Sequence, residues 1–192
     1  MTDNQRILIV SSSVRFSETL SPIVKKLTGR ETLCAVSIAE AQKTLMTNPV
    51  YAIILNAPLS DSFGIDFSVK CAKEKNYAVL MFIPKEFTEQ AAAKTSEHGI
   101  LILPKPNTQD VVGQSVSLLD ATAKKISSLK NTENVSTDKI EELRLITRAK
   151  LILISSFGMT EMSAHKFIEK RAMESRKTKA DIARGIITSY GS

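Results

Sequence analysis

The stretch VYAIILNAP, residues 50–58, determines the fold expected for the first half of this 192-residue chain. An uninterrupted run from Val50 to Leu55 is followed by the polar Asn56 and, two positions later, by a proline. Short runs of this kind, rich in β-branched residues, are typical of strands buried on both faces of a parallel sheet. Ligands bind at the carboxyl ends of such strands, so Asn56 is predicted to lie at the functional edge of an α/β sheet.

Similar apolar runs recur before and after this stretch. The predicted strands cover residues 6–10, 32–36, 50–55, 77–83 and 99–103. The segments between them have helical character, over 14–28, 38–47, 63–75 and 86–97. A strand–helix alternation repeated five times predicts a five-stranded, parallel, doubly wound α/β domain of the flavodoxin-like kind.

The remainder of the chain is predicted to be helical. A seam of apolar residues with heptad spacing comes first, formed by Val112, Val116, Leu119, Ala123 and Ile126. The seam belongs either to a last helix packed on the sheet or to a helix that runs on into a dimeric coiled coil, and we favour the coil. The predicted division is therefore an α/β domain (1–112), a coiled-coil linker helix (113–137) and a three-helix bundle (138–192).

Basic residues are concentrated in the last segment. Residues 139–192 hold 11 Lys and Arg against 6 Asp and Glu, whereas the rest of the chain holds 15 against 14. Such an asymmetry indicates a polyanionic partner for the bundle, although a solvated helical surface gives the same count.

Several classes of protein are excluded by what the sequence lacks. It has no apolar run of membrane-spanning length and no start typical of a signal peptide, so a cytoplasmic protein is expected. Cys34 and Cys71 are predicted to be buried, reduced thiols, and no metal or other cofactor is expected. Neither a glycine-rich phosphate loop nor a catalytic triad is recognisable, so we do not expect an enzyme.

Three short motifs give residues 5–120 a resemblance to the receiver domain of response regulators. They are SSS (11–13) after the first strand, LNAPLSDSFG (55–64) after the third and LPKP (103–106) after the fifth. The resemblance implies a phosphorylation site at the strand ends. Acidic residues would hold Mg²⁺, an aspartate would accept the phosphoryl group, and a hydroxyl and a lysine would bind its oxygens.

Most of these functional positions are altered in this chain. The receiver positions are occupied by Ser11 and Ser12 (metal-binding acids), Asn56 (phosphoryl acceptor), Ile83 (hydroxyl) and Lys105, the only one that is kept. An amide cannot act as the carboxylate nucleophile, and serines carry no charge for Mg²⁺. Asp61, in the following loop, is not expected to replace Asn56. The sequence predicts a pseudo-receiver for docking and dimerisation; a pocket for an uncharged ligand is the alternative.

The last segment resembles the ANTAR domain, the RNA-binding module of transcription antitermination regulators. The matching positions are Arg144, Ile146, Ala149, Lys150, Leu153, Gly158, Met159, Thr160, Glu161, Ala164, Ala172, Met173, Arg176, Ile182 and Ala183. Thr147 and Leu151 depart from the pattern, which usually has Glu and often Gly there. The resemblance implies a homodimer that binds hairpins in nascent mRNA leaders, under the control of a regulatory sensor protein or another signal.

The basic side chains of this segment are the candidates for RNA contact. They are Arg144, Arg148, Lys150, Lys170, Arg171, Arg176, Lys177, Lys179 and Arg184. Arginine offers both charge and a planar stacking surface, which suits structured RNA. The alternative is a DNA-binding regulator of the helix-turn-helix type, but the stretch TKADIARGI (178–186) has few polar residues suited to reading bases.

Overall fold

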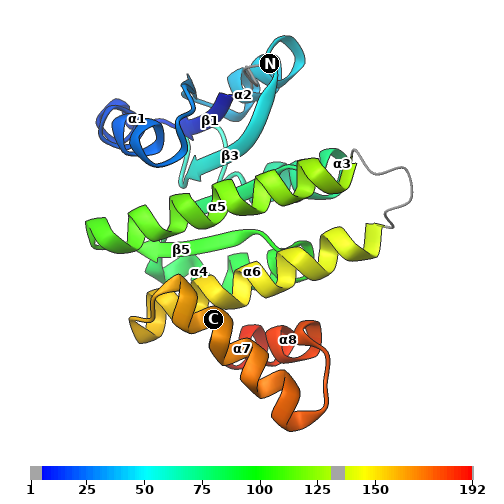
Figure 1. Cartoon of the computed structure of the whole chain (residues 1–192). Coiled ribbons are helices and arrows are strands. Elements are labelled where there is room, and N and C mark those ends of the chain that lie inside the picture. Colours follow the sequence, from blue (N-terminus) through cyan, green and yellow to red (C-terminus); the bar gives the residue numbers. More distant parts are fainter. Residues whose placement is uncertain (1–5, 131–136, 192) are drawn as a thin grey trace.

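A computed structural model of the chain describes residues 6–130 and 137–191, and Figure 1 shows an α/β domain followed by three helices. The sheet has five parallel strands in the order β2-β1-β3-β4-β5. Their bounds are β1 (Arg6–Ser11), β2 (Thr32–Ala35), β3 (Val50–Asn56), β4 (Ala78–Pro84) and β5 (Leu101–Lys105). The five predicted parallel strands are thereby confirmed.

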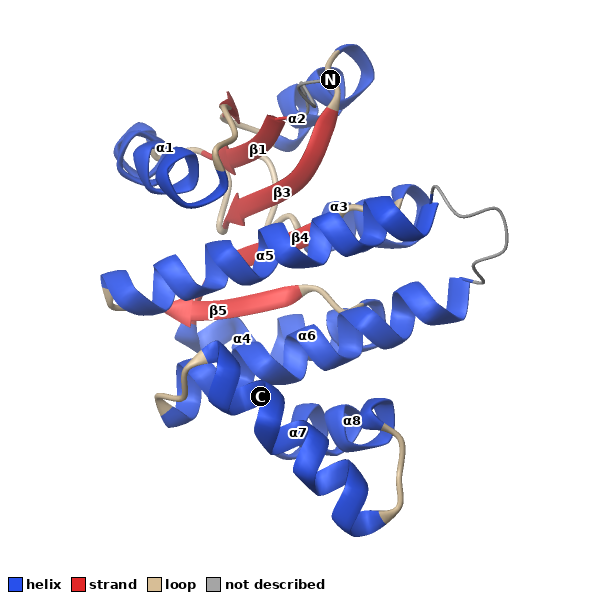
Figure 2. Cartoon of the chain, viewed as in Figure 1, coloured by secondary structure: helices blue, strands red, loops and turns tan. Residues whose placement is uncertain are grey.

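Helices cover both faces of this sheet, as the blue helices and red strands of Figure 2 show. The helices of the α/β domain are α1 (Val14–Thr28), α2 (Ile38–Thr47), α3 (Ile65–Lys75), α4 (Thr88–Thr95) and α5 (Gln109–Lys130), with short 3-10 turns η1 (Lys85–Phe87) and η2 (Ser96–His98). Side chains of α1 and α5 share one core cluster, and those of α2, α3 and α4 share the other. The predicted doubly wound architecture is confirmed.

The central strand β3 explains why the apolar run of residues 50–55 does not alternate with polar residues. Every residue of β3 is buried. Ala52 and Ile54 belong to the cluster under α1 and α5, whereas Ile53 and Leu55 belong to the cluster on the opposite face. A strand covered on both sides needs apolar residues at successive positions, which is the pattern of the sequence.

The heptad seam packs inside the chain, so a coiled coil is the wrong prediction for residues 113–130; residues 131–136 of the predicted linker lie outside the described residues. Val116 and Leu119 are fully buried, and Ala123 and Ile126 nearly so, in one cluster with the sheet and with residues of the next helix. Val112, the first seam position, is partly buried against the same cluster. A helix laid on a sheet and beside a second helix needs the same narrow apolar stripe as a coiled coil. Residues 113–130 therefore belong to α5, the last helix of the α/β domain.

Three helices complete the chain, as the sequence predicts. They are α6 (Thr137–Phe157), α7 (Glu161–Ser175) and α8 (Lys179–Tyr190). Gly158, with a φ of 65°, follows α6, and the Thr160 hydroxyl caps α7. Thr178 and Asp181 form a capping box at the start of α8, satisfying two amide groups that a helix end leaves free.

Helix α6 connects the bundle to the α/β domain. It runs back alongside α5 and also contacts β5 and η2, while its other side contacts α7 and α8 (Figure 1). Its buried residues are consequently spread around the helix. The bundle and the α/β domain thus share α6 as a common packing element.

Two further predictions concern the burial of the two cysteines and the absence of a membrane-spanning segment. Both cysteines are free, but only Cys71 is buried, while Cys34 is exposed because β2 is an edge strand. Within residues 6–130 and 137–191, no helix combines the length and apolar composition needed to cross a bilayer.

Burial of the seam within one chain makes a prediction about stability. We expect Leu119→Ala to lower the free energy of unfolding by about 2–5 kcal/mol, because it leaves a cavity under α5. The exposed Leu27→Ala in α1 is the matched control and should cost much less. Thermal unfolding at several protein concentrations checks this: the wild type and Leu119→Ala should respond to concentration in the same way, whereas a concentration dependence that Leu119→Ala changes would restore the dimeric coil.

Candidate functional site

Three of the five predicted receiver-site residues come together at the carboxyl edge of the sheet. Ser11 ends β1, Asn56 ends β3 and Lys105 ends β5. The Asn56 amide nitrogen donates to the Ser11 hydroxyl at 3.0 Å, and the Lys105 ammonium donates to the Asn56 side-chain oxygen at 2.8 Å. Lys105 also donates to the Ala57 carbonyl at 2.7 Å. We call Ser11, Asn56 and Lys105 the strand-end site.

The chemistry of this site is that of one cation among neutral dipoles. Partial burial lowers the pKa of Lys105, and the nearby Glu86 opposes that shift. Among the described residues, no carboxylate forms an ion pair with this ammonium group. The Asn56 amide uses both its donor and its acceptor within the protein, so its orientation is fixed by its two partners.

The other two predicted receiver-site residues do not join the hydrogen-bonded group. The Ser12 side chain is exposed, and its hydroxyl reaches the Pro58 carbonyl at 3.5 Å. Ile83 is fully buried in the cluster beneath α2, α3 and α4. The position that would offer a hydroxyl to a phosphoryl group therefore contributes to the core.

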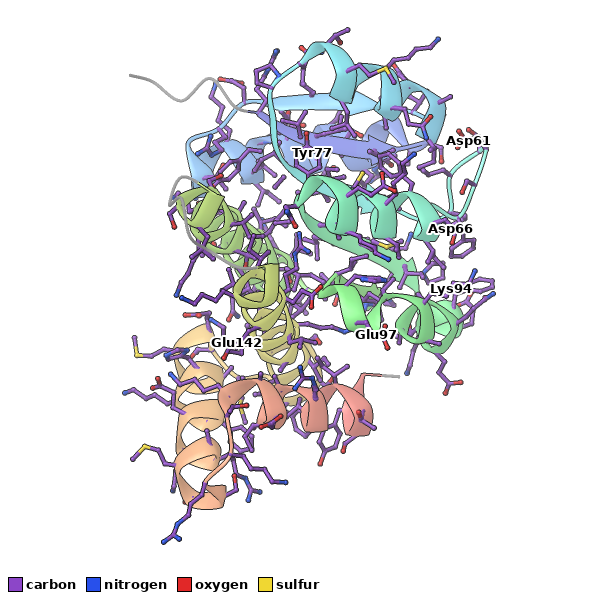
Figure 3. The ribbon with its side chains drawn as sticks, turned by 90° about the vertical axis from the view of Figure 1, so that its right-hand side faces the viewer. Asp61, Asp66, Tyr77, Lys94, Glu97 and Glu142 are labelled. Carbon is purple, nitrogen blue, oxygen red and sulfur yellow. The ribbon has the colours of Figure 1, made fainter. Side chains whose placement is uncertain are left out.

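Asp61, the acidic residue in the loop after β3, has a different role. Its carboxylate accepts from the backbone amides of Ile38 at 2.8 Å and Ala39 at 3.2 Å, at the start of α2. Figure 3 shows Asp61 in this loop at the edge of the α/β domain. A carboxylate at a helix N-terminus satisfies free amides and interacts favourably with the helix dipole. As expected, Asp61 does not take the place of Asn56.

The nine predicted RNA-contacting residues divide into three groups by their surroundings. Arg171, Arg176 and Lys177 are exposed and, among the described residues, in no ion pair. Four others pair with carboxylates: Lys150 with Glu161, Lys170 with Glu174, Lys179 with Glu169 and Arg184 with Asp181. Arg144 and Arg148 are buried.

The first group forms a basic tip at the end of the bundle farthest from the sheet. Arg171 lies near the end of α7, and Arg176 and Lys177 lie in the turn that leads to α8 (Figure 1). Arg176 caps α7 in the left-handed region, with a φ of 52°. We call Arg171, Arg176 and Lys177 the basic tip. All three side chains are exposed, and the Arg171 guanidinium lies over the Phe167 ring, 5.7 Å from its centroid.

Arg144 and Arg148 contradict the sequence prediction, because neither reaches the surface. Only 4% and 2% of their areas are exposed. Arg148 donates to the Thr95 hydroxyl at 3.1 Å, and Arg144 donates to the Tyr77 carbonyl at 3.3 Å and to the Asn76 side chain at 3.4 Å. Burial lowers the pKa of each arginine to about 10, so both stay charged at neutral pH.

Comparisons with known proteins concern the C-terminal helices and the chain as a whole. Residues 137–187 match the family model of the ANTAR domain. The transcriptional regulatory protein PdtaR of Mycobacterium tuberculosis, in strains CDC 1551 and H37Rv, is 24% identical over 160 residues, covering 82% of this chain and 74% of the relative.

Solved structures are similar in fold. A receiver domain protein from Clostridium thermocellum has a TM-score of 0.55 and 19% identity, covering 66% of this chain and 98% of its own. The beryllofluoride-activated NtrC4 receiver domain has a TM-score of 0.53 and 19% identity, covering 62% and 98%. Full-length FixJ from B. japonicum covers 97% of both chains with a TM-score of 0.54 and 9% identity. The chain therefore joins a domain of the response-regulator receiver fold to a C-terminal ANTAR domain at residues 137–187.

Proposed function

We propose that this chain is a transcription antitermination regulator that binds hairpins in nascent mRNA leaders through its ANTAR domain. The observation that carries the proposal is the basic tip, three solvated cations without carboxylate partners within a segment that matches the ANTAR model. Similarity to a transcriptional regulatory protein supports a role in transcription. The proposal assigns no catalytic step to the chain.

The chemistry of the tip suits folded RNA. Arg171 and Arg176 offer planar guanidinium groups, which contact phosphates and stack on unpaired bases, while Lys177 adds a compact charge. The other predicted contacts, Lys150, Lys170, Lys179 and Arg184, carry carboxylate partners that an incoming phosphate would have to displace. Among the predicted RNA-contacting residues, those of the basic tip can therefore bind a phosphate without breaking an existing ion pair.

The proposal includes a receiver-like domain that does not work by phosphorylation. Asn56 in place of the acceptor carboxylate supplies no nucleophile, and Ser11 and Ser12 supply no charge for a divalent metal. The hydrogen bonds from Asn56 to Ser11 and from Lys105 to Asn56 support a site occupied by its own side chains. Control would then come from a regulatory sensor protein, a ligand or the abundance of the chain.

Assembly as a homodimer stays part of the proposal, but its interface must lie outside the heptad seam. The seam is covered by the sheet and by α6 of the same chain. A dimer that presents two ANTAR domains to two hairpins would have to use another surface, and the mass of the protein in solution tests whether a dimer forms.

The basic tip predicts how RNA binding responds to mutation. We expect the double variant Arg171→Gln/Lys177→Gln to weaken binding of a hairpin RNA about tenfold and to reduce the salt dependence by about one to two phosphate contacts. The matched control is Arg15→Gln/Lys43→Gln, which removes the same charges from exposed positions on α1 and α2. Titrations at two salt concentrations, against hairpin RNA and duplex DNA of equal charge, provide the measurement.

Two results would contradict the RNA proposal. Equal weakening by the control variant would show that only net charge matters. Binding of duplex DNA as tight as that of the hairpin, at the higher salt concentration, would favour the helix-turn-helix alternative.

The strand-end site predicts that the receiver-like domain is inert to phosphoryl donors. After treatment with acetyl phosphate and Mg²⁺, the intact mass of the protein should show no added phosphoryl group, because residue 56 has no carboxylate. A stable phosphoryl adduct that disappears in Asn56→Ala would overturn this part of the proposal. An adduct that persists in Asn56→Ala would place the chemistry at a different side chain.

A further inference from the structure

Helices α2 and α3 leave a pocket between them on the face of the sheet opposite to α1 and α5. Helix α3 packs against α4, whereas the backbones of α2 and α3 stay farther apart. The pocket has a volume of about 480 Å³. Leu45 and Met46 line it from α2, Phe67 and Cys71 from α3, and Tyr77 from the segment that follows α3. We call it the α2–α3 pocket.

The buried part of the pocket lining is apolar and uncharged. Phe67 and Cys71 belong to the core cluster beneath α2, α3 and α4, and Leu45 and Tyr77 pack against the same cluster. In Figure 3, Tyr77 lies at the end of α3 opposite to Asp66. Burial raises the pKa of the Cys71 thiol to about 12 and raises the pKa of the Tyr77 phenol, so both groups are neutral at physiological pH. This part of the lining thus offers aromatic and sulfur surface without charge.

The exposed part of the lining is polar but has no net charge. Gln42 on α2 and Lys70 and Glu74 on α3 line the pocket and are exposed. Lys70 lowers the pKa of the Cys71 thiol and Glu74 raises it, so the two charges oppose each other at the pocket. A charged ligand would gain little attraction from such a pair and would lose hydration energy on entry. The Gln42 amide supplies a neutral donor and acceptor for a polar group of a ligand.

Met46 gives the pocket an apolar side chain that water surrounds. Its side chain is 85% exposed, although the residue lines the pocket. An unbranched thioether adapts to ligands of different shape and makes favourable contacts with aromatic rings. An apolar molecule bound beside Met46 would remove both its own surface and the methionine surface from water, and this burial favours binding.

A larger hollow between α1 and α5 has a different chemical character. Its volume is about 770 Å³, and its lining includes the charged residues Lys26, Asp110 and Glu161. Among the described residues, no aromatic side chain lines it. Ligand pockets are mostly lined by apolar and aromatic side chains with a few polar groups, and this description fits the α2–α3 pocket better.

We propose that the α2–α3 pocket binds a small, uncharged molecule with an apolar or aromatic body. A volume of about 480 Å³ lies within the range of ligand pockets, roughly 300–1,000 Å³. The ligand body contacts the rings of Phe67 and Tyr77 and the thioether of Met46, while Gln42 binds its polar group. The lining belongs to α2, α3 and the segment after α3, whereas the strand-end site lies at the ends of β1, β3 and β5. The inference therefore goes beyond the proposed function and does not depend on RNA.

The experiment titrates the full chain with N-phenyl-1-naphthylamine, an uncharged aromatic probe whose fluorescence increases in apolar surroundings. Met46→Lys places a charge beside the pocket and should weaken probe binding at least about fivefold. Gln42→Trp fills the pocket from an exposed position and should weaken binding by a similar factor. The matched controls are Met173→Lys on α7, where the methionine is 81% exposed, and Gln90→Trp at an exposed position on α4. Both controls should keep the wild-type affinity.

Alkylation of the two cysteines locates the bound probe independently of its fluorescence. Cys71 is buried in the pocket lining and should react with N-ethylmaleimide more slowly when the probe is bound. Cys34 is exposed on β2 and should react at an unchanged rate. At the same probe concentration, Met46→Lys should lose most of the protection of Cys71.

Four outcomes would overturn the inference. They are a wild-type chain that does not bind the probe, wild-type affinity in both Met46→Lys and Gln42→Trp, loss of binding in Leu27→Lys between α1 and α5 instead, and a change of oligomeric mass in Met46→Lys, which would place a second copy at the pocket. A chain that binds the probe as expected but binds no hairpin RNA would uphold the inference and contradict the proposed function.

Discussion

The arrangement of this chain depends on the packing of α6 between two partners. On one side it completes the cover of the sheet beside α5 and β5, and on the other it is the central helix of the ANTAR domain. Because one helix serves both, the position of the bundle is set by contacts at Gly99, Thr95 and Thr122. The heptad seam of α5 finds its partner in the same chain for the same reason, since α6 occupies the place that a second copy would take in a coiled coil.

The strand-end site shows how a receiver fold persists without the charges of a phosphorylation site. In a site that holds Mg²⁺, several carboxylates repel one another until the cation is bound. Here Ser11 and Asn56 replace charged groups with dipoles, and Lys105 is held by two neutral oxygens. The three side chains of this site thus hydrogen-bond to one another and to the Ala57 carbonyl.

Local sequence patterns predicted the strands and the helix caps because their causes are local. A doubly buried strand needs a run such as residues 50–55, and Thr160 and Thr178 cap helices through neighbours a few positions away. The packing of the heptad seam and the burial of Arg144 and Arg148 depend on contacts between residues distant in sequence, which local patterns do not show. One signal was present: Thr147, where the ANTAR pattern usually has Glu, is buried on the same face of α6 as Arg144 and Arg148.

Arg144 and Arg148 place two charged groups inside the contact between α6 and the α/β domain. Burial costs these groups hydration energy, so the contact depends on the close fit at Gly99 and on the apolar cluster that α6 shares with α5 and the sheet. Any partner that binds the α/β domain only when α6 is docked, or only when it is released, shifts the equilibrium by its difference in affinity for the two states.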